Sequence, residues 1–333
     1  MSRRCDSVGS AAPTGRLAPS PTGVLHLGNA RSFLLAWLDA RHRGGRILMR
    51  IEDLETPRVK PGAEAAALTD LRWLGLDWDG EVLVQSRRAA AHEEALARLA
   101  ARGLVYPCTC TRRDVEHAAA APHAGHEGPV YPGTCRGRWA SADEAEAATG
   151  RAPAWRFRVP EPGSAAGVVR FHDRCVGEVE VDVGAELGDF VVFRRAGGAA
   201  YQLAVVVDDA FQGVDSVLRG ADLLPSTARQ ILLQRALGLP TPEYAHPPLV
   251  VGPDGRRLAK RHGDTSLRHL RECGHTPEEV VGWLAHASGL RPDPSPLRPA
   301  DLVTEFELAR VPREPVVWHG NWPTRIRPLA EEE

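Results

Sequence analysis

Residues 16–29 read Arg-Leu-Ala-Pro-Ser-Pro-Thr-Gly-Val-Leu-His-Leu-Gly-Asn, and this stretch decides the fold class. A strand-like run at 16–19 enters a turn rich in proline and glycine, and Asn29 is placed to cap the apolar-periodic helix that follows. A second apolar strand is expected at 46–51. Alternating strand and helix predict a parallel α/β sheet, and the glycine-rich turn before a helix favours bound phosphate.

The pattern outside this stretch predicts an interrupted sheet with a short helical end. Helices are expected at about 62–74, 89–102 and 226–237, and near 266–272 and 277–287, after which the chain becomes proline-rich coil. Between 104 and 188 the pattern changes to a cysteine-bearing stretch and short strands at 154–159 and 168–183, and it resumes with a strand-like run at 190–194, a Gly197-Gly198 turn and the apolar run 201–207. We expect an α/β catalytic domain at 15–103 and 189–250, an inserted α+β module at 104–188, a terminal region at 251–333 and a disordered tail at 1–14.

Composition limits the class of protein without identifying it. The 333 residues carry a net charge of -2 with a pI near 6.7, which gives no electrostatic indication of nucleic-acid binding. No apolar run approaches the roughly 20 residues of a membrane helix, and no apolar stretch follows the basic N-terminal residues as in a secretory signal. We therefore expect a globular, cytoplasmic protein whose six cysteines are reduced.

Three of the cysteines have a spacing that suits a metal. Cys108, Cys110 and Cys135 lie two and twenty-five positions apart and can supply part of a tetrahedral zinc site, or they can be buried reduced thiols. A fourth ligand is needed for zinc, and His117, His123 and His126 are candidates in the intervening loop. The remaining cysteines, at 5, 175 and 273, show no such spacing.

Residues 19–29 resemble the HIGH region of class I aminoacyl-tRNA synthetases, and 16–23 are similar to the glutamyl and glutaminyl subgroup. Segments at 30–31, 41–45, 50–53, 201–209 and 219–220 recur in the same order in that subgroup, so the resemblance covers roughly 15–266. It implies a Rossmann-like fold and an ATP site at Pro19, His26, Gly28, Asn29 and Lys260. His26 and Lys260 would be the catalytic residues, stabilising phosphate charge.

Lys260 belongs to a segment, 257–261, that resembles the second class I motif, the lysine loop, and follows the turn Pro253-Asp254-Gly255. Arg257 and Ala259 depart from that motif, because lysine is usual at the first position and the alanine removes a hydroxyl. These departures predict altered loop dynamics or ATP affinity.

The resemblance also implies a glutamate pocket, formed by Arg16, Ser20, Glu52, Tyr201 and Arg219. Such a pocket needs cations for two carboxylates and an anion for the ammonium group, since a buried unpaired charge costs several kcal/mol. Arginine suits bidentate recognition of carboxylates.

Within the subgroup the chain resembles the truncated glutamyl-queuosine synthetases. Only 72 residues follow Arg261, too few for an anticodon-binding domain, so we expect a short helical stem-contact region there. In the related enzymes the Cys-X-Cys and Tyr-Pro-Gly-Thr-Cys segments hold structural zinc, which implies the ligands Cys108, Cys110, Tyr131 and Cys135. The implied reaction is activation of L-glutamate with ATP and Mg²⁺, without tRNA, then transfer to queuosine at the wobble position of tRNA(Asp), by a monomer.

Three other functions stay open at this point. A truncated enzyme charging the 3′ end of tRNA(Glu) would share every catalytic motif. A small-molecule nucleotidylyltransferase of the HIGH superfamily would share the nucleotide loop but not the glutamate pocket. A catalytically inactive tRNA-binding paralogue would not need His26, Glu52, Arg219 and Lys260.

Overall fold

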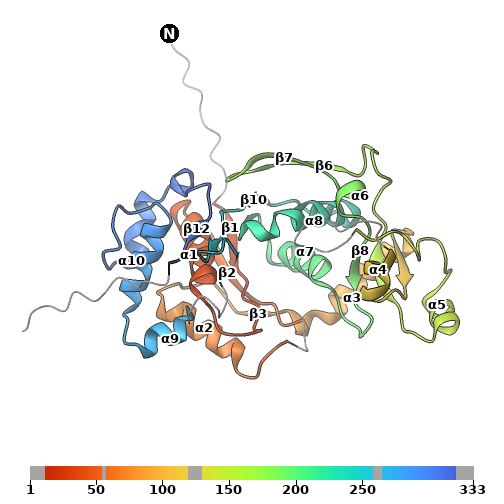
Figure 1. Ribbon diagram of the computed structural model, residues 1–333, viewed down its shortest axis with the longest axis horizontal. Coiled ribbons are helices and arrows are strands. Elements are labelled where there is room, and N and C mark those ends of the chain that lie inside the picture. The colour runs from red at the N-terminus through yellow and green to blue at the C-terminus, as the bar shows by residue number, and fades with distance from the viewer. Residues whose placement is uncertain (1–11, 55–57, 119–129, 257, 259–264, 320–333) are drawn as a thin grey trace, which may run out of the picture.

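The computed structural model describes residues 12–54, 58–118, 130–256, 258 and 265–319. Figure 1 shows a central sheet with helices packed around it. Helices α9 (Leu267–Glu272) and α10 (Pro277–Ala287) lie toward one end of the long axis, and α4 (Arg112–Ala118) and α5 (Ala142–Thr149) toward the other. None of the described helices is long and apolar enough to cross a membrane.

The central sheet is parallel, as the sequence predicts. Strand β2 (Arg46–Ile51) pairs in parallel with β1 (Thr14–Leu17) and with β3 (Leu83–Val84), and β9 (Ser216–Leu218) pairs in parallel with β10 (Glu243–Ala245). The two groups meet where the backbone N–H of Asp215 donates to the Thr14 carbonyl. The structure thus has two groups of parallel strands, β3-β2-β1 and β9-β10, which lie next to each other along β1 and β9.

The helices around this sheet follow the predicted periodicity. The predicted helices at 62–74, 89–102 and 226–237 appear as α2 (Ala63–Trp73), α3 (Ala89–Ala101) and α8 (Leu224–Leu237), and the first 3₁₀ segments are η1 (Gln85–Arg88) and η2 (Ala221–Leu223). The apolar run at 201–207 begins a helix, α7 (Tyr201–Gln212), whose buried residues belong to one of the two large apolar cores. Helix α1 (Leu27–His42) packs into the other core.

Helix α1 begins earlier than expected. Its N-cap is His26 and not Asn29, because the His26 ring nitrogen Nδ1 accepts the backbone N–H groups of Gly28 and Asn29. Asn29 instead accepts the His26 backbone N–H through its side chain, which completes a reciprocal capping box. The N-terminal tail is also shorter than predicted, since Thr14 already belongs to β1, while residues 1–11 lie outside the described part.

The strand pairs in the middle of the chain do not follow the expected boundaries of the inserted module at 104–188. Strand β8 (Phe190–Phe193), expected in the parallel sheet, pairs antiparallel with β5 (Ala154–Phe157), which also pairs with β4 (Val105–Cys108). The predicted strand region at 168–183 forms the hairpin of β6 (Val168–Asp173) and β7 (Gly177–Asp182), followed by α6 (Val183–Glu186). Because β6 pairs with β10, this hairpin extends the catalytic sheet.

The segment expected to be coil after α10 contains regular structure. Short 3₁₀ helices η4 (Pro299–Glu305) and η5 (Leu308–Arg310) precede β12 (Val316–Val317), which pairs in parallel with β11 (Val250–Val251). Trp318 is buried edge-on against Trp283 of α10, with ring centroids 4.9 Å apart. The prediction of coil was wrong here because this packing lies between residues far apart in sequence.

Candidate active site

A cleft of about 440 Å³ opens at the carboxyl ends of the central strands. Eight of the residues expected at the ATP and glutamate sites line it together: Arg16, Ser20, His26, Gly28, Asn29, Glu52, Tyr201 and Arg219. Pro19 is not in the lining, but its carbonyl accepts the backbone N–H of Glu52 at 3.0 Å and so joins the first two loops of the site. Residues that belong to separate segments of the sequence thus meet in one cavity.

The start of α1 builds the side of the cleft that is expected to bind the nucleotide, called the nucleotide side below. Because Nδ1 of His26 accepts two backbone N–H groups, the proton of the neutral ring is assigned to Nε2. Gly28 leaves little space for a side chain, since an added Cβ would lie 3.0 Å from the His26 ring and the ring would have to shift. The turn therefore combines a helix start with an imidazole N–H, which suits a phosphate.

The chain on both sides of the predicted lysine loop borders this cleft. The backbone N–H of Leu27 donates to the Thr265 carbonyl at 3.0 Å, and that of Leu258 donates to Val250, which lines the cleft. Lys260 itself, together with Arg257 and Ala259, lies outside the described residues. Its assigned role therefore stays a prediction.

The other side of the cleft, which is expected to bind glutamate and is called the glutamate side below, holds a buried network of charged side chains. Arg50, fully buried in β2, donates to Asp209 Oδ1 at 2.6 Å and to Glu52 Oε1 at 3.1 Å. Arg16 Nε lies 3.6 Å from the same Asp209 oxygen. Burial raises the pKa of Glu52 against the opposing effect of Arg50 and Arg16, and burial lowers the pKa of Arg16.

Arg219 occupies the other wall of the glutamate side. It follows β9, is 5% exposed, and donates through Nη1 to the Tyr201 hydroxyl at 3.3 Å. The next residue, Gly220, lies close to two side chains, because an added Cβ would lie 2.7 Å from Asp222 and 2.8 Å from Leu249, and these side chains would have to shift. Both neighbours line the cleft, so the chain is closely packed where Arg219 enters it.

Counting charges around the glutamate side shows what it can accept. Among the residues that the structure describes, Arg16, Arg50 and Arg219 lie beside the carboxylates of Glu52 and Asp209, while Asp208, which also acts on Arg50, is itself paired with Arg88. Arg58 and Asp222, which also line the cleft, leave this excess of one positive charge unchanged. A ligand carrying one net negative charge would balance the site, and a neutral amide would not.

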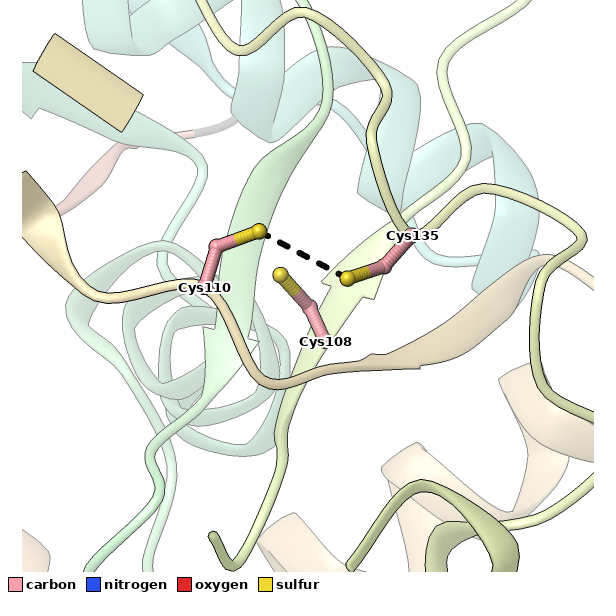
Figure 2. Close-up of side chains that lie close together, drawn as sticks. All are labelled: Cys108, Cys110 and Cys135. Carbon is pink, nitrogen blue, oxygen red and sulfur yellow. Dashed lines mark hydrogen bonds between the residues drawn. The ribbon is translucent and has the colours of Figure 1, made fainter. Parts of the chain in front are cut away.

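The three cysteines expected to bind metal do converge. Figure 2 shows the side chains of Cys108, Cys110 and Cys135 with their sulfur atoms directed toward one another, and the three sulfurs lie within 4.8 Å. The Cys110 and Cys135 sulfurs are 3.6 Å apart, and all three cysteines are free thiols. Zinc–sulfur bonds of about 2.3 Å give tetrahedral sulfur–sulfur edges of about 3.8 Å, so this spacing fits a metal.

Tyr131 supplies a fourth polar atom at this cluster. Its hydroxyl lies 3.4 Å from the Cys108 sulfur and 3.6 Å from the Cys110 sulfur, and it accepts the Cys135 backbone N–H at 2.8 Å. Burial works to raise the pKa of Cys135, but hydrogen bonds with Tyr131 and the Thr109 backbone lower it to about 7. The competing candidates His117, His123 and His126 lie outside the described side chains.

Several residues that support the site carried no prediction from the sequence. Arg50 and Asp209 fall inside the segments that resemble the synthetase subgroup, so the resemblance alone could have directed attention to them. Asp173 and His246 gave no usable signal, because each is a single polar residue whose partners are distant in sequence. Asp173 lay in the region expected to be the inserted module.

Comparisons with known proteins agree with this geometry. Residues 14–293 match the family model of the catalytic domain of class I tRNA synthetases for glutamate and glutamine. A curated relative from Symbiobacterium thermophilum, named Glutamyl-Q tRNA(Asp) synthetase, is 52% identical over 91% of this chain and 94% of its own length. A protein of the same name from Nocardia farcinica is 51% identical over 92% and 93%.

Among solved structures, a glutamate-tRNA synthetase from Elizabethkingia anophelis is similar with a TM-score of 0.77 and 26% identity. That likeness covers 92% of this chain and 68% of the synthetase chain. A glutamate tRNA ligase from Elizabethkingia meningosepticum, solved in complex with its amino acid, has a TM-score of 0.78 and is likewise covered over 67% of its length.

Proposed function

We propose that this chain, which belongs to the class I tRNA synthetases for glutamate and glutamine and, within them, to the glutamyl-Q tRNA(Asp) synthetases, attaches glutamate to queuosine in tRNA(Asp). As a member of this family it is an enzyme, a ligase. The reaction begins with L-glutamate and Mg-ATP and does not need tRNA for its first step. Since ATP and tRNA are its substrates, the proposal assigns the enzyme to the cytoplasm.

One observation carries the proposal for the amino acid. The cleft has one positive charge in excess and shares its lining with the capped start of α1. Glutamate has one net negative charge and glutamine has none, so the excess favours glutamate. Arg16 and Arg219 would receive its carboxylates, with Glu52, Ser20 and Tyr201 near its ammonium and neighbouring polar atoms.

The first chemical step joins a glutamate carboxylate oxygen to the α-phosphorus of ATP, and the bond from that phosphorus to pyrophosphate breaks. The Nε2–H of His26 and the N–H groups at the start of α1 would stabilise the phosphate charge, and Lys260 would act from the lysine loop. A hydroxyl of the acceptor then attacks the glutamyl-adenylate, and AMP leaves. Positioning is sufficient for this step, so no side-chain nucleophile is needed.

The acceptor is proposed from the degree of identity to the two kinds of relative. This chain is 52% identical to the Symbiobacterium protein named Glutamyl-Q tRNA(Asp) synthetase but 26% identical to the Elizabethkingia anophelis glutamate-tRNA synthetase. An acceptor base presented on an anticodon loop can be recognised in the cleft by stacking and edge contacts, which demand little overall positive charge. The near-neutral pI is consistent with this mode of recognition.

We also propose structural zinc held by Cys108, Cys110, Cys135 and Tyr131, because their four polar atoms have tetrahedral spacing. Arg156 donates to the Cys108 sulfur at 3.3 Å and lies 3.8 Å from the centre of the Tyr131 ring. Its positive charge would stabilise a site rich in thiolates. Zinc bound there would tie the loop around 131–135 to the end of β4.

The test of the proposed function measures transfer of labelled glutamate, with Mg-ATP, to purified tRNA(Asp) with and without queuosine and to tRNA(Glu). Label on tRNA(Asp) only when queuosine is present is the expected result. Label on tRNA(Glu) would mean a charging enzyme and overturn the acceptor. Absence of glutamate-dependent ATP–pyrophosphate exchange would overturn glutamate activation itself.

A further inference from the structure

The partners of Arg219 differ from those of the other buried arginines in the cleft. Arg219 Nε donates to His246 Nε2 at 3.1 Å, and Nη2 donates to Thr227 Oγ1 at 2.8 Å. With the Tyr201 hydroxyl, all its side-chain partners are neutral groups. Among the ion pairs of the described residues none includes Arg219, whereas Arg16 and Arg50 both reach Asp209.

The contact with Arg219 fixes the state of His246. Since arginine is always a donor, His246 Nε2 must accept, and the neutral ring then carries its proton on Nδ1. Nδ1 lies 2.6 Å from Asp173 Oδ2, and both side chains are fully buried. The other Asp173 oxygen accepts the backbone N–H groups of Cys175, Val176 and His246, so the carboxylate cannot rotate freely.

We propose that Asp173 and His246 are positioning residues for glutamate recognition, which orient Arg219 toward the substrate carboxylate without neutralising its charge. This inference rests on the proposed function, because it assigns a task to the glutamate pocket. It also gives a role to the pairing of β6 with β10, because the end of β6 places Asp173 behind the cleft.

The order in which Asp173, His246 and Arg219 follow one another matters for the selection of glutamate over glutamine. A carboxylate in direct contact with Arg219 would pair with the guanidinium and compete with the substrate carboxylate. A neutral imidazole placed between them transmits the orientation of Asp173 and keeps the two charges apart. Arg219 then remains a cation in need of an anion, and burying it beside a neutral amide such as glutamine is unfavourable.

Exchange of Asp173 for asparagine tests the orientation directly. In Asp173→Asn the amide oxygen can keep the three backbone N–H groups, while the amide N–H₂ faces Nδ1 of His246. The imidazole must then carry its proton on Nε2, which also lies 3.1 Å from the Thr227 hydroxyl, and the Nε–H of Arg219 loses its acceptor. A hydrogen bond to a charged group corresponds to roughly tenfold to a hundredfold in affinity, and we expect the KM for glutamate to rise by that factor.

Two variants of His246 form a matched pair. His246→Gln can place its amide oxygen near the former Nε2 position and accept from Arg219, so it should retain most of the glutamate affinity. His246→Asn can donate to Asp173 but is too short to reach Arg219, so it should resemble Asp173→Asn. His92→Gln is the control, since His92 contacts Asp208 at 3.1 Å in another buried histidine–aspartate pair away from Arg219.

The measurements are KM for glutamate and for ATP in tRNA-independent pyrophosphate exchange, the ratio of kcat/KM for glutamate over glutamine, and melting temperature. Selective ¹⁵N-histidine spectra report the protonated nitrogen of His246, assigned by its loss in His246→Gln. We expect Nδ1–H in the wild type, Nε2–H in Asp173→Asn, and a rise in KM for glutamate that ATP does not share. The control should change melting temperature alone.

The outcomes separate this inference from the proposed function. Equal rises in both KM values, or an unchanged glutamate KM in Asp173→Asn and His246→Asn, would overturn the positioning role while wild-type exchange upholds glutamate activation. An Nε2–H signal in the wild type would overturn it as well. A wild type without glutamate-dependent exchange would overturn both.

Discussion

The two sides of the cleft are built in opposite ways. On the nucleotide side, His26 contacts the backbone of Gly28 and the side chain of Asn29, at separations of two and three residues. On the glutamate side, Arg219 reaches His246 across 27 residues, and His246 reaches Asp173 across 73. The capped turn of the nucleotide side is therefore formed within one short segment, although Leu27 also bonds to Thr265, whereas the contacts of Arg219 on the glutamate side exist only after distant strands have packed together.

The largest expected effect comes from removing Arg219, the cation on the glutamate side that takes part in no ion pair among the described residues. Arg219→Gln leaves the substrate carboxylate in a buried site without its partner, which should lower glutamate-dependent exchange by roughly a thousandfold. Arg235→Gln, on the exposed side of α8, is the matched control and should retain activity. Pyrophosphate exchange with glutamate and with glutamine measures the effect; near-normal glutamate activation in Arg219→Gln would contradict the assignment of the pocket.

The nucleotide side can be broken with two variants of one residue. His26→Asn should keep the cap of α1, because asparagine is a good N-cap, but it loses the ring N–H that would face phosphate. We expect an unchanged melting temperature and exchange slower by roughly a hundredfold to a thousandfold. His26→Ala should lose about 1 kcal/mol of stability as well. If His26→Asn exchanged pyrophosphate at the normal rate, His26 would serve only as a cap.

The same contrast explains what the sequence could predict. Helices such as α2, α3 and α10 follow from apolar periodicity and end signals within one segment, and their predicted bounds agree closely with the structure. The predicted sheet positions of β8 and β6 were wrong, because strand pairing depends on partners elsewhere in the chain. A single aspartate or histidine, such as Asp173 or His246, forms no repeating pattern from which its role could be predicted.

For the site, resemblance supplied residue identities, and the structure supplied their arrangement. Arg16 and Arg219 were expected from matched segments, but their contrasting partners, Asp209 for one and His246 for the other, could not be read from sequence. The N-cap of α1 was misassigned to Asn29 because histidine is an unusual cap, and its ring contacts appear only in three dimensions. Contacts within a few residues can therefore be predicted from the sequence more readily than contacts between distant segments.

A smaller effect is expected from pH, which should change the stability of the protein through His246 on the glutamate side. Burial lowers the pKa of His246 to about 4, with Arg219 and Arg16 nearby acting in the same direction and Asp173 opposing. The ring of Tyr244 also stacks on it. In the unfolded chain the histidine titrates near 6.5, so between pH 6.5 and 4 the unfolded state binds more protons. Its stabilising contribution is therefore complete above pH 6.5 and is lost as pH falls to about 4.

The measurement compares the free energy of unfolding of wild type and His246→Gln by chemical denaturation from pH 7.5 to 4. The difference between the two should shrink as pH falls, by at most on the order of 3 kcal/mol. Parallel curves would show that folding leaves the pKa of His246 unchanged, which would contradict an imidazole that burial keeps neutral between Arg219 and Asp173.

The smallest expected effect on glutamate activation concerns the cysteine cluster, which is assembled from residues 2 and 25 positions apart and lies at the end of β4, a strand in contact with α5. Cys108→Ser should lose bound zinc, measured by elemental analysis, and lower the melting temperature, because the metal ties β4 to the loop that carries Tyr131 and Cys135. Exchange should stay within about twofold, since neither side of the cleft uses these residues as partners. Cys175→Ser is the control and should retain the metal. An unchanged zinc content in Cys108→Ser would contradict the site, and a large loss of exchange would show that the cluster and the cleft are energetically coupled.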